Sequence, residues 1–110
     1  MMIPTLTRHE IAKYSELPAL VGQPIKIGDE EIALFRLSNG EVKAVENKSP
    51  HPKGGILSDG LVSGHYVYCP LYDWKISLTD GNVQAPDEGH VKTYDIQVEE
   101  DKVFFLNKEG

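Results

Sequence analysis

The stretch SPHPKGGILSDGLVSGHYVYCPLYDW, residues 49–74, holds two short loops on either side of an apolar, hairpin-like segment. The first loop starts at Ser49 and presents His51 between two prolines, which keep its backbone extended. The second loop starts at Cys69 and reaches Tyr72 three residues later. Histidine and cysteine are common metal ligands, so a site is expected where these loops meet. Each residue also has an ordinary alternative, His51 as a surface loop histidine and Cys69 as a small buried hydrophobe.

The composition is typical of one globular domain. The chain has 110 residues, of which 40% are hydrophobic and 25% charged, so we expect a single domain over residues 1–110. The net charge of -6 disfavours a nucleic-acid partner, and no stretch approaches the ~20 apolar residues that cross a bilayer. The single cysteine excludes an internal disulfide and suits a reducing compartment. These features predict a cytoplasmic protein that binds neither nucleic acid nor membrane.

Short runs rich in β-branched and aromatic residues recur along the chain and alternate with turn residues. Asn39-Gly40 favours a two-residue type I′ turn between two of these runs. The pattern predicts an all-β fold, an antiparallel β-sandwich or small barrel. The predicted strands lie at 25–27, 31–37, 41–46, 61–63, 66–69, 75–78, 92–98 and 102–106.

The N-terminal segment is predicted to contain one short helix. Thr7-Arg8-His9-Glu10 matches a capping box, in which the threonine and the glutamate satisfy each other's backbone amides. The helix is expected from about Arg8 to Tyr14 and should end before Leu17-Pro18.

The two loops resemble those of a Rieske-type domain through HPKGG (51–55), LSDG (57–60) and CPLYDW (69–74). A Rieske [2Fe–2S] centre takes two cysteine thiolates on one iron and two imidazoles on the other. The family pattern is Cys-x-His followed by Cys-x-x-His, and the four matching positions here are Ser49, His51, Cys69 and Tyr72. The resemblance implies a Rieske-like fold with two cluster-type loops in which each iron would keep one ligand and lose one.

Ser49 and Tyr72 are poor substitutes for cysteine and histidine. Both offer hard oxygen donors where iron–sulfur chemistry prefers thiolate and imidazole. A phenol also titrates near ~10, and its oxygen lies beyond the reach of an imidazole nitrogen. A hydrogen-bonded pair or an apolar plug is therefore expected in place of a cluster. No cofactor is expected in this chain, and His51 and Cys69 are residual ligand positions.

Residues 31–106 further resemble the small subunit of assimilatory NAD(P)H-dependent nitrite reductase. The similar segments are IALF (32–35), LVSG (61–64), DWKISL (73–78) and DGNVQAP (80–86). In that family the large subunit carries flavin, an iron–sulfur cluster and sirohaem, and it reduces nitrite to ammonia. The resemblance implies that this chain has no catalytic residues and that the large subunit is its partner. Ring-hydroxylating ferredoxins share much of the same ligand pattern.

Three hypotheses follow for the function. The chain is a non-redox subunit of a nitrite reductase, a working Rieske [2Fe–2S] electron-transfer component of this or a ring-hydroxylating system, or a mononuclear metal module built from His51 and Cys69. The ligand count favours the first hypothesis. Exposed apolar and aromatic side chains are typical interface anchors, so the loop tips are predicted to bind the partner. These tip residues are Pro50, Pro70, Leu71 and Tyr72.

Overall fold

Strand β3 (Glu30–Arg36) is buried on both faces and lies at the centre of the molecule. The computed structural model describes residues 5–50, 55–70 and 74–109, and in it the four residues 32–35 are 0% exposed. Ile32 and Leu34 pack into one hydrophobic core, and Ala33 and Phe35 pack into another. Side chains alternate between the faces of a strand, so β3 separates two cores.

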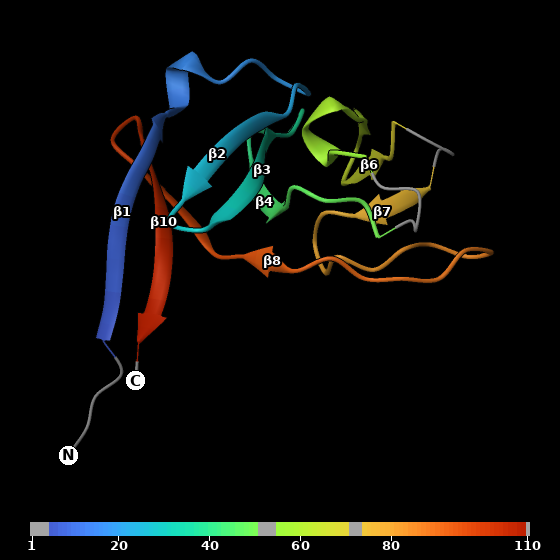
Figure 1. Ribbon diagram of the computed structural model, residues 1–110. Helices are drawn as coiled ribbons and strands as arrows, with labels where there is room; N and C mark the ends of the chain where they lie inside the picture. The colour runs from blue at the N-terminus through green and yellow to red at the C-terminus, as the bar shows by residue number, and fades with distance from the viewer. Residues whose placement is uncertain (1–4, 51–54, 71–73, 110) are drawn as a thin grey trace.

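Three antiparallel sheets surround these cores, with strand orders β2-β3-β4-β8, β1-β10-β9 and β5-β6-β7. Figure 1 shows β1 and β10 at one end of the molecule and β6 and β7 at the other. The prediction of an all-β antiparallel fold is confirmed. No helix in the described part of the chain is long and apolar enough to span a bilayer. The remaining strands are β1 (Thr5–Lys13), β2 (Gln23–Ile27), β4 (Val42–Glu46), β5 (Leu61–Ser63), β6 (Tyr66–Tyr68), β7 (Lys75–Ser77), β8 (Thr93–Tyr94), β9 (Ile96–Glu99) and β10 (Lys102–Glu109).

The predicted N-terminal helix is wrong, because residues 5–13 form strand β1. β1 pairs with β10 from Thr5↔Glu109 to Lys13↔Lys102, with one register shift. A helix of about seven residues is marginal without packing, whereas a long partner strand supplies backbone hydrogen bonds along the segment. Arg8 adds to the pairing, because its guanidinium lies 4.1 Å from the Phe104 ring centre. The chain makes only a 3-10 turn, η1 (Tyr14–Glu16), after β1.

The hairpin between β3 and β4 is confirmed, but its predicted type I′ turn is wrong. Gly40 has a φ of 93°, and Asn39 is not among the residues with positive φ. The Gly40 N–H donates to the Leu37 carbonyl at 3.0 Å, and the Leu37 N–H donates to the Glu41 carbonyl at 2.7 Å. This longer connection needs glycine only at its last turn position, as hairpins with three or more loop residues often do.

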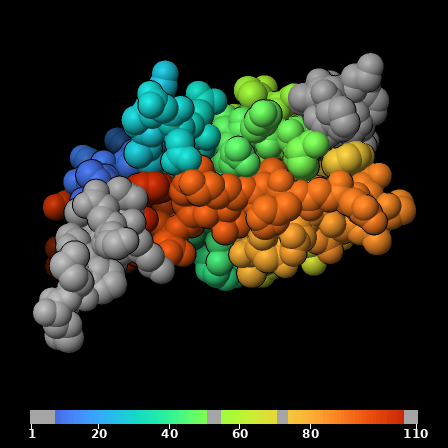
Figure 2. Space-filling model, turned by 60° about the horizontal axis from the view of Figure 1, so that its bottom comes forward, coloured from blue at the N-terminus to red at the C-terminus, as the bar shows by residue number. Residues whose placement is uncertain are grey.

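The run predicted as one strand at 92–98 forms two strands in different sheets. β8 pairs with β4, whereas β9 pairs with β10, and the chain crosses between the sheets at Asp95. In Figure 2 the orange segment that contains β8 crosses the face shown as a continuous band. Alternating polarity predicts extended backbone along this run but cannot show that the pairing partner changes.

Candidate functional site

Ser49 and Cys69 touch each other between the bases of the two loops. A backbone hydrogen bond closes each loop: the Ser49 N–H donates to the Gly55 carbonyl, and the Cys69 N–H donates to the Trp74 carbonyl, both at 2.9 Å. The Cys69 thiol donates to the Ser49 hydroxyl, with Sγ and Oγ 2.8 Å apart. Ser49 is 2% exposed and Cys69 is 1% exposed. The structure therefore brings these two predicted positions into one buried contact.

This pair does not supply the ligands that a Rieske centre needs on its cysteine-bound iron. That iron takes two thiolates, and here one of the two donors is a hydroxyl. Two tetrahedral ligands on one ion, with an oxygen at about 2.0 Å and a sulfur at about 2.3 Å, would stand roughly 3.5 Å apart. Oγ and Sγ are closer than that and share a proton. The donor set and the spacing both suit a hydrogen bond better than a shared iron.

Cys69 also belongs to the hydrophobic core. It lies in the same buried cluster as Phe35 of β3 and Leu57, which is 0% exposed. A thiol in such surroundings packs as a small apolar group with a weak donor. The ordinary alternative for Cys69, a buried core cysteine, accounts for this environment.

Three of the predicted site residues, His51, Leu71 and Tyr72, lie outside the described residues. Of the other two loop-tip residues, Pro50 is partly buried, and Pro70 is exposed. A Cβ atom built on Gly89 would lie 3.2 Å from the Cβ of Pro50, so the two residues approach closely. Within residues 5–50, 55–70 and 74–109, no three His, Cys, Asp or Glu side chains gather where a metal ion could bind.

Asn47 braces the first loop, a role that the sequence alone does not indicate. Its side chain, 6% exposed, donates to Glu31 Oε1 at 2.9 Å and to Ser58 Oγ at 3.1 Å. Its amide oxygen accepts the Ser58 N–H at 2.8 Å. Ser58 lies in the 3-10 turn η2 (Leu57–Asp59), so Asn47 links the turn that follows the loop to the start of β3. An asparagine after a strand is common in any turn and gives no signal of this bracing role.

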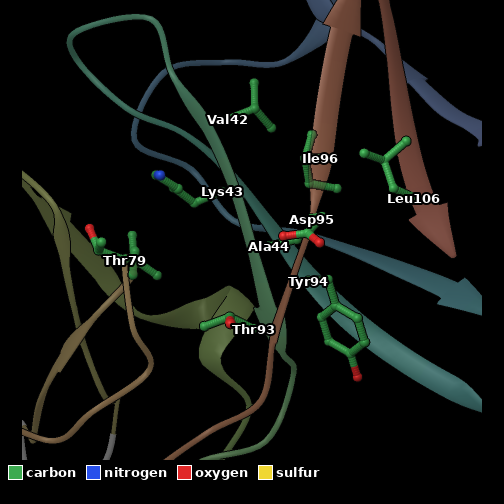
Figure 3. A pocket seen from close by; sticks show the side chains of 10 residues that line it. Val42, Lys43, Ala44, Thr79, Thr93, Tyr94, Asp95, Ile96 and Leu106 are labelled. Atoms are coloured by element: carbon green, nitrogen blue, oxygen red, sulfur yellow. The ribbon is translucent and has the colours of Figure 1, made fainter. Parts of the chain in front are cut away.

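A second candidate site is a groove of about 370 Å³ where the chain leaves β4 and crosses from β8 to β9. Figure 3 shows Lys43 and Thr79 on one side of the groove and Ile96 and Leu106 on the other. Lys43 is already paired, because its ammonium lies 3.3 Å from the Glu41 carboxylate. The apolar side chains are those of Val42, Ile96 and Leu106.

Tyr94 is the aromatic residue of this groove, and its phenol is held protonated. Partial burial and the neighbouring Glu30 carboxylate raise the pKa of Tyr94 to about 12. Its hydroxyl donates to Glu30 Oε1 at 3.3 Å. A phenol with this pKa is neutral at physiological pH and is a poor general base. We assign no chemistry to the groove.

The comparisons with known proteins agree on one type of domain. A family model described as a Rieske-like [2Fe-2S] domain matches residues 8–105. The nitrite reductase (NADH) small subunit of Salmonella typhimurium is 32% identical over 78 residues, which cover 66% of this chain and 72% of that subunit. The solved structure of the Escherichia coli protein NirD has a TM-score of 0.81 at 27% identity, covering 94% of this chain and 98% of NirD.

A much longer relative contains a similar segment. The nitrite reductase [NAD(P)H] large subunit of Klebsiella oxytoca is 30% identical over 111 residues, which cover 97% of this chain and 12% of that protein. This chain therefore spans 12% of the length of that relative. The same type of domain thus occurs both as a small subunit and as one part of a large subunit.

Replacing Asn47 with alanine should lower the free energy of unfolding by about 2–3 kcal/mol, because the buried Ser58 N–H would lose its acceptor. Urea unfolding measures the change. The matched control is Asn39→Ala, which removes an exposed asparagine whose oxygen accepts the Glu41 N–H and should cost under about 1 kcal/mol. Equal losses in the two variants would show that Asn47 does not brace the loop.

Proposed function

The chain belongs to the Rieske-like [2Fe–2S] domain family, and we propose that it is the small, non-redox subunit of an assimilatory NAD(P)H-dependent nitrite reductase. In this role the chain has no catalytic residues of its own. It supports a large subunit that reduces nitrite to ammonia. The observation that carries the non-redox part is the buried contact between Ser49 and Cys69.

The relatives support the large subunit as the partner. Separate small subunits match this chain over most of their length, and the Klebsiella large subunit contains a similar segment within one polypeptide. A domain that is covalently joined to the reductase in one organism must work beside it there. The separate chain would keep that position by non-covalent docking. An NAD(P)H-dependent partner and one unpaired cysteine both suit the cytoplasm, where we place the complex.

The chemistry of the paired side chains supports a non-redox role. Electron transfer through a Rieske centre needs the iron held by thiolates, and a serine hydroxyl ionises much less readily than a thiol. The Ser49 oxygen is already used as the acceptor for the Cys69 thiol. Binding an iron here would break this contact and would still leave an oxygen in a thiolate position.

Electron transfer is the alternative with a specific observation in its favour, because the matching family is described by its [2Fe-2S] domain. It requires His51 and Tyr72 to be the ligands of the second iron, where a tyrosine oxygen would replace an imidazole nitrogen. A mononuclear site at His51 and Cys69 would compete with the hydrogen bond to Ser49. We therefore favour the non-redox role over both electron transfer and a mononuclear metal site.

We further propose that the loop tips contact the large subunit. Pro70 is exposed, which suits a contact residue, and Pro50 lies at the start of the other loop. Leu71 and Tyr72 complete the group in sequence. Apolar and aromatic groups of this kind supply much of the binding energy at protein interfaces.

Replacing Cys69 with alanine should leave nitrite reduction by the assembled complex within about twofold of the wild type, because no electron passes through residue 69. His51→Ala should behave in the same way. The assay is nitrite-dependent oxidation of NAD(P)H by the complex, with assembly checked by gel filtration. Lost turnover in a Cys69→Ala complex that assembles normally would restore the electron-transfer alternative.

The double change Ser49→Cys with Tyr72→His should allow a [2Fe–2S] cluster to assemble on reconstitution, because it completes the ligand set with His51 and Cys69. Neither single change should suffice, and the two single variants are the controls. Visible absorption and acid-labile sulfide report the cluster. A colourless double variant would mean that the loop backbone no longer fits a cluster.

A further inference from the structure

The β5-β6-β7 sheet has one face in the core and one face turned outward. Val62, Val67 and Ile76 pair across the three strands, and Val67 and Ile76 are 0% exposed. Their neighbours along each strand point to the opposite face, because successive side chains alternate. We call the resulting outward group the tyrosine face. It consists of Leu61, Tyr66, Tyr68 and Lys75, and the same register places the exposed Ser63 and the buried Ser77 on either side of Tyr66.

Leu61 on this face is an unusually exposed apolar residue. Its side chain is 77% exposed, whereas the other exposed large apolar residues in the described part of the chain lie between 39% and 49%. Leu61 pairs directly with Tyr68, which pairs with Lys75, so the three side chains form a row across the sheet. An exposed leucine next to a partly buried tyrosine is an apolar feature that suits a protein interface.

Lys75 and Tyr66 add polar character and order to the face. The Lys75 ammonium lies 4.2 Å from the centre of the Tyr66 ring, which is a cation–π contact. Tyr66, Tyr68 and Lys75 are each partly buried, so part of each side chain is already supported by the fold. Supported tyrosines lose little conformational entropy on binding, and tyrosine is enriched among interface hot spots.

The tyrosine face adjoins the second loop. β6 runs from Tyr66 through Tyr68 directly into Cys69 and the exposed Pro70. Figure 1 places β6 and β7 far from β1 and β10, so the face lies at the end of the molecule that carries the loops. A partner that covers Pro70 could extend over this sheet without crossing the rest of the fold.

Resting on the function proposed above, we propose that the tyrosine face docks on the large subunit of the reductase. The occupant follows from the Klebsiella relative, in which a segment similar to this chain is 12% of one large-subunit polypeptide. In that polypeptide the similar segment is covalently joined to the rest of the large subunit. The partner surface should offer an apolar depression for Leu61 and hydrogen-bond acceptors for the tyrosine hydroxyls.

Replacing Leu61 with aspartate should weaken binding of the chain to its large subunit by about tenfold or more, because the interface would bury a charge. The matched control is Val98→Asp, which places the same charge on β9 in the β1-β10-β9 sheet, where Val98 is 43% exposed. The control should bind within about twofold of the wild type. Calorimetry with the purified large subunit gives the dissociation constants, and circular dichroism shows whether each variant is folded.

The outcomes separate this inference from the function on which it rests. A wild-type chain that does not bind the large subunit contradicts the proposed function itself. Wild-type binding with an unchanged Leu61→Asp affinity overturns the docking surface alone. A wild-type dimer that Leu61→Asp converts to a monomer, with unchanged affinity for the large subunit, assigns the face to a second copy and also overturns it.

Hydrogen exchange gives a test that needs no substitution. Amides of residues 61–68 should exchange more slowly in the complex than in the free chain, whereas amides of residues 96–104 should not change. Unchanged exchange at 61–68 in a complex that does form overturns the proposal. Slower exchange at 61–68 supports it even if Leu61→Asp fails to fold.

Discussion

The burial of β3 on both faces is the constraint on which the rest of the structure depends. Ile32 and Leu34 anchor the core shared with β10, whereas Ala33 and Phe35 anchor the core shared with β6, β7 and Cys69. Four consecutive residues with no exposed surface require a sheet on either side, so three sheets form around one strand. Fully burying such side chains contributes about 1.5–3 kcal/mol for each large one. This packing fixes where β4 and β6 end, and therefore where the two loops begin.

The sequence predicted the local pattern well and the long-range pairing poorly. Runs of β-branched and aromatic residues predicted the strands and the all-β class, and the ligand spacing predicted the paired loops. The capping box at Thr7 and Glu10 failed because pairing with β10 outweighed a weak helical preference. Asn47 was missed because its partners, Glu31 and Ser58, come from separate segments that only the fold brings together.

The cores of this Rieske-like fold are built from apolar side chains, and protein groups also hold the region between the two loops. The Ser49–Cys69 contact lies against the core that β3 anchors. Asn47 holds the adjoining turn through two hydrogen bonds to Ser58 and makes a third to Glu31 of β3. Every one of these interactions is made by protein groups alone. In the non-redox role proposed above, the outer surface of the domain serves assembly with the reductase.

The most direct test of the central claim is the iron and acid-labile sulfide content of the chain purified without oxygen. We expect a colourless protein with far less than one iron per chain, because the Cys69 thiol is hydrogen-bonded to the Ser49 hydroxyl. About two irons and two sulfides per chain, with the red-brown colour of a [2Fe–2S] centre, would contradict it.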